Sequence, residues 1–383
     1  MPEVPSEMVR LPRSGIRAVM DLAWAQTGPV IRLEVGQPDR IPPEHVRQAM
    51  ADSVLAGETG YTPNAGIPEL RSACAAKLAR VNRIQVGTDQ VMVTAGSMQG
   101  LSSVMLGLTE AGQEILVPDP GWPNYEMAAR IAQAVPVAYP LAAADAFLPD
   151  PGIIESLITD RTRMLVVNSP SNPLGTVIDP SLMGELAELA ERHDLWLLSD
   201  ECYDQIVFDR DVAPSPASTH PDHVVSVHSF SKTYAMTGLR VAYVSGPGPV
   251  ISTLTKMQEA LVACVNGPAQ KAAVAALEGP QDFVTDMRDL YRRRRDRAVA
   301  TAEQMGLPYL RPDGAFYLWL PLGKRIGDPM EFCRRLVAEE GVAVAPGSTF
   351  GRLGEGAIRV SLAAAEDDIV EGLERISRFH RLG

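Results

Sequence analysis

The chain has 383 residues, of which 46% are hydrophobic and 21% are charged, a composition typical of a folded globular protein with a large buried core. A formal net charge of −12 disfavours nucleic acid and anionic membrane surfaces as the main partners, because both are negatively charged. The length exceeds that of one ordinary core, so we expect two domains, or a large domain with a smaller one attached.

The N-terminus and the cysteines lead to expectations about the compartment. Residues 1–20 carry charges and prolines where a signal peptide requires an uninterrupted apolar stretch, and no run of about 18 apolar residues occurs. The four cysteines are widely separated and form no C-x-x-C pair, which favours reduced thiols, and no histidine lies in a metal-binding pattern. We therefore expect a soluble cytoplasmic protein without a bound metal ion.

Short apolar segments recur up to about residue 246, with helical patterns between them. These segments are rich in Val, Ile and Leu and apolar on both faces, as are strands covered by helices on both sides. The pattern predicts an α/β fold with a mostly parallel, doubly wound sheet. The predicted strands span residues 91–96, 114–119, 164–169, 195–200, 224–229 and 240–246, and the predicted helices span 67–81, 181–193 and 253–263.

The sequence pattern changes near Asp282, where a long charged helix containing YRRRRDRA begins. It leads to the segment FYLWLPL, a further helix and a predicted strand at residues 358–363. The four consecutive arginines are interpreted as a solvated helix face rather than a nucleic-acid patch, given the acidic net charge. We predict a large domain at residues 41–281 and a smaller α+β domain at 282–383, joined by an N-terminal segment at 1–40.

The residues that follow each predicted strand are the candidate site, because ligands of open α/β sheets bind beyond the carboxyl ends of the strands. Gly96, Ser97 and Met98 open a helix, where free backbone N–H groups can hold a phosphate. Trp122, between a glycine and a proline, could be a flat stacking surface, and Asn172 lies in a stiff proline-containing loop. Each has a simpler alternative. The segment at Gly96 can be an ordinary turn between a strand and a helix, Trp122 a packing residue, and the segment at Asn172 an ordinary loop.

The later strand ends supply ionisable groups. Asp200 follows a buried apolar run, where an unpaired carboxylate is costly, so it requires a positive partner. Tyr203 comes three residues later. Lys232 lies in the loop after Ser229, and Arg240 follows eight residues further on. A single lysine in a loop is usually a surface charge, so its neighbours decide how it is interpreted.

One small molecule, pyridoxal 5'-phosphate, requires this whole set of groups. It has a dianionic phosphate, a flat ring, a ring nitrogen that must stay protonated, a phenolate oxygen and an aldehyde that condenses with lysine. The nucleotide-binding patterns G-x-x-x-x-G-K-[ST] and G-x-G-x-x-G after a strand are both missing from the sequence. Pyridoxal 5'-phosphate is therefore the predicted cofactor.

The sequence resembles the fold-type I, class I/II pyridoxal-phosphate-dependent aminotransferases, and is most similar in pattern to their bacterial aspartate aminotransferase-like branch. A single motif would be weak, but these occur in the family's order over nearly the whole chain. They are VGQPD (35–39), GYTPNAGIPELR (60–71), AGSMQG (95–100), PDPGWPNY (118–125), NSPSNPLG (168–175), SDECY (199–203), SFSKTYAMTGLR (229–240), PGSTFG (346–351) and IRVS (358–361).

The resemblance implies a role for each ring-binding residue. Lys232 would form a Schiff base with the cofactor, and Asp200 would pair with the pyridine nitrogen. Tyr203 and Asn172 would donate hydrogen bonds to the ring oxygen, and Trp122 would stack on the ring.

The resemblance also implies how the phosphate and the substrate are held. Tyr61 matches a tyrosine that reaches the phosphate in the neighbouring subunit, which implies a homodimer with active sites at the interface. Gly36, Asn172 and Arg359 would contact the substrate α-carboxylate. The phosphate would be bound by Ser229, Arg240 and the backbone of Gly96, Ser97 and Met98.

The residues around Arg359 agree with that role. Ile358 and Val360 share one face of the predicted strand, so Arg359 lies on the other face. A planar guanidinium is well suited to bind a carboxylate through two hydrogen bonds. A structural arginine in a salt bridge is the alternative.

The predicted function is transfer of the α-amino group of an amino acid to a 2-oxo acid by a ping-pong mechanism. A C–S β-lyase or related eliminating enzyme is the alternative, because the same site geometry also serves β-elimination. A non-catalytic regulator with this fold is a remote third possibility. Such proteins usually carry an appended DNA-binding domain, and we do not expect one in this sequence. Met98 stands where aspartate-specific relatives have a polar or basic residue, and residues 259–267 contain no arginine, so we expect neutral aliphatic or aromatic donors.

Overall fold

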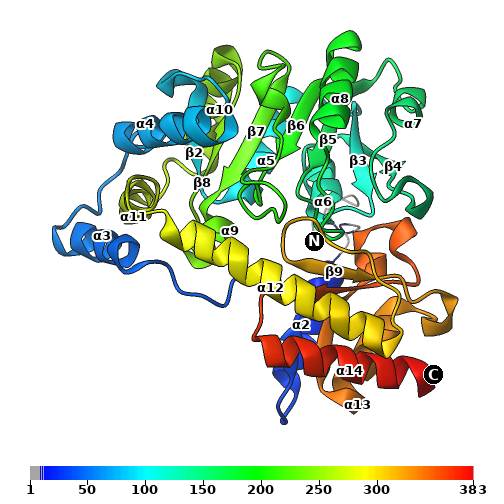
Figure 1. Ribbon diagram of the computed structural model, residues 1–383. Helices are drawn as coiled ribbons and strands as arrows, with labels where there is room; N and C mark the ends of the chain where they lie inside the picture. The colour runs from blue at the N-terminus through cyan, green and yellow to red at the C-terminus, as the bar shows by residue number, and fades with distance from the viewer. Residues whose placement is uncertain (1–8, 10, 12, 383) are drawn as a thin grey trace, which may run out of the picture.

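The computed structural model describes residues 9, 11 and 13–382, and within this part of the chain the named strands form a seven-stranded and a four-stranded sheet (Figure 1). The larger sheet has the order β2-β8-β7-β6-β5-β3-β4. Only β8 runs antiparallel to its neighbours among these described strands, which confirms the predicted mostly parallel sheet. Its strands are β2 (Val91–Thr94), β3 (Glu114–Asp119), β4 (Val135–Pro140), β5 (Thr162–Asn168), β6 (Trp196–Asp200), β7 (Val224–Ser229) and β8 (Ala242–Ser245).

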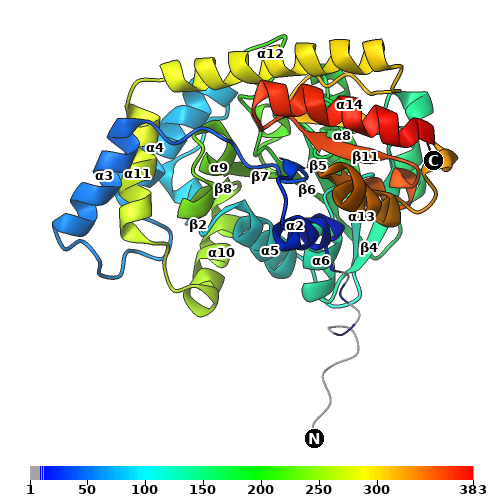
Figure 2. The same ribbon diagram turned by 90° about the horizontal axis from the view of Figure 1, so that it is seen from below.

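Helices cover both faces of this sheet (Figure 2), which explains why its strands are apolar on both sides. In β5, Leu165 and Val167 pack into one hydrophobic core, while Met164 and Val166 pack into the other. The first core includes α4 (Pro68–Lys77), α8 (Pro180–Arg192) and α11 (Gly267–Glu278), and the second includes α5 (Ser97–Leu108), α6 (Asn124–Ile131) and α10 (Gly248–Leu261).

The smaller sheet combines the two ends of the chain. Its order is β1-β10-β11-β9, and the N-terminal strand β1 runs parallel to β10. The helices α12 and α14 pack side by side against it, as Figures 1 and 2 show. The elements are α2 (Gly15–Ala25), β1 (Ile31–Leu33), α12 (Asp282–Met305), β9 (Tyr317–Leu320), α13 (Pro329–Glu340), β10 (Val342–Pro346), β11 (Ile358–Ser361) and α14 (Glu366–Leu382).

The division into residues 1–40, 41–281 and 282–383 remains our proposal. It agrees with the pairing of β1 with β10 and with the start of α12 at Asp282. Residues 1–8, 10 and 12 of the first segment lie outside the described residues.

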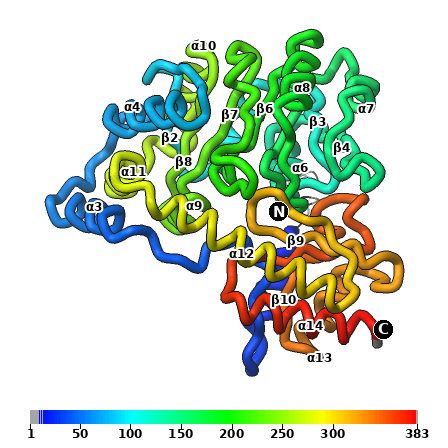
Figure 3. The backbone as a smooth tube through the Cα atoms, in the orientation of Figure 1, coloured from blue at the N-terminus to red at the C-terminus, as the bar shows by residue number. Residues whose placement is uncertain are grey.

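The remaining helices link these layers. α3 (Glu44–Leu55) packs beside α11, as the tube in Figure 3 shows, and α7 (Pro151–Ser156) precedes β5. The short helix α9 (Phe230–Thr233) directly follows β7. No helix in the part of the chain that the structure describes has the length and apolar character needed to cross a membrane.

Two local predictions were wrong. The strand predicted to start at Arg240 starts at Ala242, because Arg240 has a left-handed backbone with φ 54°. The edge strand β4 was missed, since its sequence VPVAYP contains two prolines, which are confined to edge strands and break the expected pattern.

Candidate active site

A cavity of about 1000 Å³ lies between the carboxyl ends of β5 and β6 and the smaller sheet. Asn168 and Asp200 reach it from the large sheet, while Tyr317 reaches it from β9. The structure thus brings together residues far apart in the sequence. Of the predicted site residues, those in the cavity wall are Gly36, Ser97, Met98, Trp122, Asn172, Asp200, Tyr203, Lys232, Arg240 and Arg359.

Lys232 is presented by the short helix α9. Ser229, the last residue of β7, caps this helix by accepting a hydrogen bond from the backbone N–H of Ser231 at 3.1 Å. The half-buried Lys232 amine donates to the carbonyl oxygen of Gly36 at 2.6 Å. Burial lowers the pKa of this amine to about 8, and the positive charge of Arg359 acts in the same direction. A substantial fraction of Lys232 is therefore neutral just above physiological pH.

This lowered pKa gives a testable pH dependence. In the cofactor-free protein we expect an amine-directed reagent to label Lys232 with a half-maximal rate near pH 8, because only the neutral amine reacts. Peptide mass spectrometry from about pH 6 to about pH 11 measures this rate. A half-maximal rate near the ordinary lysine value of about 10.4 would contradict the burial argument.

Asp200 is the last residue of β6 and is 3% exposed. Its carboxylate accepts hydrogen bonds from the Tyr125 hydroxyl at 2.6 Å and from the Cys202 backbone N–H at 3.2 Å. Burial raises the pKa of the Asp200 carboxyl, while these two donors oppose the rise. Both donors are neutral, so neither supplies the positive partner that a buried carboxylate requires. A cationic group of a bound molecule would supply it.

Arg359 lies on β11 and is 1% exposed. Its two terminal nitrogens donate to the Asn172 side-chain oxygen at 2.7 Å and to the Glu34 backbone oxygen at 2.6 Å. The guanidinium carbon lies 4.3 Å from the centroid of the Tyr317 ring. The Glu34 carboxylate pairs instead with Arg32, so both acceptors of Arg359 are neutral. This arrangement argues against a structural salt bridge and leaves the charge of Arg359 for a ligand carboxylate.

Replacing Arg359 by lysine is expected to raise KM for the amino acid and to lower kcat/KM by about 100-fold, because lysine cannot reproduce two parallel hydrogen bonds. Steady-state kinetics with one amino acid donor at several 2-oxo acid concentrations measures both constants. An unchanged KM would show that the substrate carboxylate is bound elsewhere.

The phenol groups at the cavity are also fixed by packing. The hydroxyls of Tyr203 and Tyr317 lie 2.8 Å apart, and both side chains are buried. A Cβ atom added at Gly36 would lie 1.9 Å from the Tyr317 oxygen. The glycine is therefore required for the close approach of this backbone to the cavity wall.

The N-terminus of α5 forms a concave surface suited to an anion. Gly96 precedes the helix with φ +82°, and an added Cβ would lie 2.1 Å from a terminal nitrogen of Arg240. Ser97 and Met98 occupy the first turn, where backbone N–H groups have no partner within the helix. Arg240 is exposed and donates to the Thr237 carbonyl oxygen at 2.8 Å. These groups fit a phosphate.

Three predicted residues are not in the cavity wall. Gly96 and Ser229 lie directly beside it, where they shape the start of α5 and of α9. Tyr61 lies between α3 and α4 with 94% of its surface exposed. Trp122 is in the wall and packs edge to face against Tyr125 at a centroid distance of 5.6 Å.

The sequence analysis missed Tyr125, Tyr317 and Asn168 as site residues. Tyr125 belongs to the motif PDPGWPNY, so its position was a usable signal. Tyr317 gave no such signal, because its place depends on the pairing of β9 with β11. Asn168 links two strand ends by donating to the Asp200 backbone oxygen at 3.0 Å and accepting from the Asn172 N–H at 2.8 Å.

The doubly wound sheet presents Lys232 and Asp200 to the cavity and the smaller sheet presents Arg359, an arrangement that fits the fold-type I enzymes. The chain belongs to the class I and II aminotransferase family, whose family model matches residues 28–376. It is therefore an aminotransferase, and the predicted family and enzyme class are confirmed.

Individual relatives and solved structures agree with this assignment. The chain is 37% identical over 352 residues to the aspartate/prephenate aminotransferase of Thermus thermophilus, covering 91% of this chain and 90% of that one. It is 33% identical over 378 residues to the aspartate aminotransferase of Pyrococcus horikoshii, covering 98% and 96%. The solved Thermus thermophilus aspartate aminotransferase with maleate matches with a TM-score of 0.95 at 35% identity, covering 99% and 100%.

Another similar structure is named for a different class of substrate. It is an aromatic aminotransferase from Pyrococcus horikoshii, which matches with a TM-score of 0.88 at 34% identity and covers 95% of this chain and 98% of that one.

Proposed function

We propose that this aminotransferase uses pyridoxal 5'-phosphate bound covalently to Lys232. The observation that carries the proposal is the convergence of Lys232, Asp200 and Arg359 on one cavity. The residues present fit this cofactor, because the surface formed by Gly96 and Arg240 suits its phosphate and the Asp200 carboxylate lacks a positive partner. When bound, the cofactor supplies an electron sink for the charge left when the substrate loses its Cα proton.

The chain's own residues would then divide the work. The Lys232 amine, with its lowered pKa, would accept the proton from the substrate Cα and pass it to the carbon that carries the cofactor's aldehyde group. Tyr125 and the Cys202 N–H fix the Asp200 carboxylate, which would pair in its ionised form with the protonated ring nitrogen of the cofactor. Buried surroundings strengthen these interactions, because water does not screen them.

Arg359 and Asn172 orient the substrate. The Arg359 guanidinium binds the α-carboxylate through two hydrogen bonds, and Asn172 holds the guanidinium in place. A carboxylate bound in this way stays on the substrate while the Cα proton leaves. Proton transfer, and with it transamination, is therefore favoured over decarboxylation.

A panel of single amino acids tests the reaction and separates it from the alternatives. Incubating the holoenzyme with one amino acid is expected to yield one 2-oxo acid and the aminated cofactor, seen by absorbance and chromatography. Ammonia and pyruvate released from a cysteine conjugate, without aminated cofactor, would select the β-lyase. If no amino acid reacted, the proposal would fail.

The same panel tests the donor class, for which we propose neutral aliphatic or aromatic amino acids. Met98 lies in the cavity wall with the uncharged side chains of Trp122 and Met127, and Asn124 donates to its sulfur at 3.2 Å. We expect leucine or phenylalanine to react with a higher kcat/KM than aspartate. If aspartate is preferred, the donor proposal is wrong, and Arg17, an exposed cation of α2 at the cavity, becomes the candidate for its second carboxylate.

We also propose a cytoplasmic homodimer with active sites at the subunit interface. The exposed side chain of Tyr61, outside its own cavity, is compatible with contact to a partner's phosphate. Light scattering of the holoenzyme should give about twice the chain mass of 41.3 kDa. An active species of single-chain mass would contradict the shared site.

A further inference from the structure

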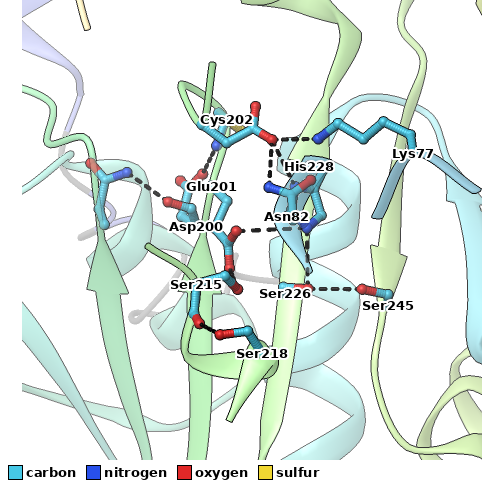
Figure 4. Close-up of polar contacts among 12 residues, drawn as sticks. Lys77, Asn82, Asp200, Glu201, Cys202, Ser215, Ser218, Ser226, His228 and Ser245 are labelled. Atoms are coloured by element: carbon cyan, nitrogen blue, oxygen red, sulfur yellow. Dashed lines mark hydrogen bonds and ion pairs between the residues drawn. The ribbon is translucent and has the colours of Figure 1, made fainter. Parts of the chain in front are cut away.

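A group of buried ionisable side chains lies behind the cavity wall (Figure 4). It consists of Lys77 at the end of α4, Glu201 and Asp204 in the loop after β6, and His228 on β7. Their exposures are 4%, 1%, 3% and 1%, and none of them lines the cavity. We call these four residues the buried ionic group. Ionisable side chains are rarely buried to this extent unless they are paired.

The loop after β6 is divided between the two sites. Asp200, Cys202 and Tyr203 line the cavity, whereas Glu201 and Asp204 belong to the buried ionic group. The backbone follows the same pattern, because the Glu201 N–H donates to Val227 on β7 at 2.9 Å, one residue before His228. The residues that face the cofactor site are thus held from behind by their immediate neighbours.

Asp204 connects the loop to α4. Its carboxylate oxygen Oδ2 accepts from the Lys77 amine and, at 2.9 Å, from the Asn82 side-chain amide. Its backbone oxygen accepts from the Ala213 N–H at 2.7 Å, which closes the loop on the other side. Asp204 is therefore fixed through both its side chain and its main chain.

His228 lies between the two carboxylates. Its Nδ1 is 3.6 Å from Asp204 Oδ2, and its Nε2 is 3.8 Å from Glu201 Oε2. The ring stacks on Tyr243 of β8 at a centroid distance of 5.0 Å, and Nε2 also lies 3.2 Å from the Ser226 hydroxyl. Figure 4 shows His228 between Glu201 and the groups around Lys77.

The charges of this group balance only when one extra proton is bound. Two carboxylates and one ammonium leave one net negative charge, which is costly to bury. A proton on His228, or on Glu201, neutralises the group. Burial raises the pKa of the Glu201 carboxyl, and the positive charge of His228 opposes this rise. Protonation of the Glu201 carboxyl is therefore favoured by its burial and would lower the net negative charge of the group.

We propose that the buried ionic group is a positioning device for the reaction, tying the ends of β6 and β7 together so that Asp200 and Lys232 keep their relative placement. The proposal rests on the proposed roles of those two residues. Asp200 directly precedes Glu201, and Ser229, which caps the helix carrying Lys232, directly follows His228. A change in the group is thus transmitted over one peptide unit to Asp200, and through Ser229 and the short helix α9 to Lys232.

The test uses the holoenzyme with Glu201→Gln and His228→Gln, which remove one proton-binding group each and keep side chains of similar size. Both variants are expected to lower kcat by about tenfold or more with little change in KM, because small misplacements of reacting groups are expensive. We also expect the pH at which the visible spectrum of the bound cofactor changes to shift by about half a unit or more.

Two controls separate positioning from general loss of stability. Leu373→Ala opens a cavity beside the smaller sheet without removing a charged or hydrogen-bonding group, and serves as a destabilised control whose buried ionic group is intact. Ser245→Ala removes the 2.8 Å contact between Ser245 and Ser226 at the edge of the group. Neither control is expected to shift the spectral transition.

A further variant is needed if the proteins with single substitutions do not fold. Lys77→Met combined with Asp204→Asn removes one charge of each sign, so the double variant should be more stable than Asp204→Asn alone. It should still show the shifted spectral transition. If the network variants match Leu373→Ala in spectrum and in kcat per bound cofactor, the positioning role is wrong. If the wild-type protein neither binds the cofactor nor transaminates, the proposed function itself fails.

Discussion

Replacing Lys232 by alanine is expected to lower the rate of transamination by about 1000-fold or more, because the variant loses both the covalent attachment and the proton-transferring amine. Among the described residues that line the cavity, the other cations are all arginines, which do not exchange protons near neutral pH, so none of them can replace the Lys232 amine. They are Arg13, Arg17, Arg240 and Arg359. Removal of a partly buried ammonium should leave the folded protein at least as stable as the wild type.

Single-turnover kinetics with purified Lys232→Ala protein, loaded with cofactor in excess, measures this effect. Lys256→Ala, which removes an exposed lysine of α10, serves as a matched control and should retain full activity. A Lys232→Ala variant with more than about a tenth of the wild-type rate would exclude the catalytic role of Lys232.

Replacing Asp200 by asparagine is expected to lower kcat by about 100-fold to 10,000-fold, because the amide cannot keep the ring nitrogen protonated. The substitution preserves the size of the side chain, and its amide oxygen can still accept from the Cys202 N–H while its amide N–H donates to the Tyr125 oxygen, which reverses that hydrogen bond. Since burial raises the pKa of Asp200, its charged form is disfavoured in the fold, and the neutral amide should not lower the melting temperature.

The Asp200→Asn variant should still bind the cofactor at Lys232, which distinguishes a loss of chemistry from a loss of binding. Absorbance titration with pyridoxal 5'-phosphate and steady-state kinetics measure the two properties separately. Near-normal kcat with intact binding would mean that the carboxylate does not set the protonation of the ring nitrogen.

Much of the larger sheet could be predicted from the sequence because its strands are apolar on both faces. Residues 114–119 and 224–229 form β3 and β7 with the predicted bounds. The smaller sheet was harder, because the three-residue strand β1 pairs with β10 more than 300 residues away and carries no local signal of this pairing. The edge strand β4 escaped because prolines interrupt its pattern.

The position of the main site residues could also be predicted from the sequence. Parallel strands bring their carboxyl ends to one edge, so Asp200 and Lys232 had to lie near each other once their strands were placed. The partners contributed by side-chain packing could not be predicted in this way. Tyr317 approaches through β9, and Lys77, at the end of an ordinary helical pattern, reaches the buried Asp204 only in the folded chain.

The most direct test of the central claim is to locate the cofactor on the chain. The holoenzyme is treated with borohydride, which makes a lysine–pyridoxal bond permanent, and is then digested and analysed by peptide mass spectrometry. We predict a single modified peptide that carries the pyridoxyl phosphate on Lys232. Modification of another lysine, or no modification of a fully active enzyme, would contradict the account.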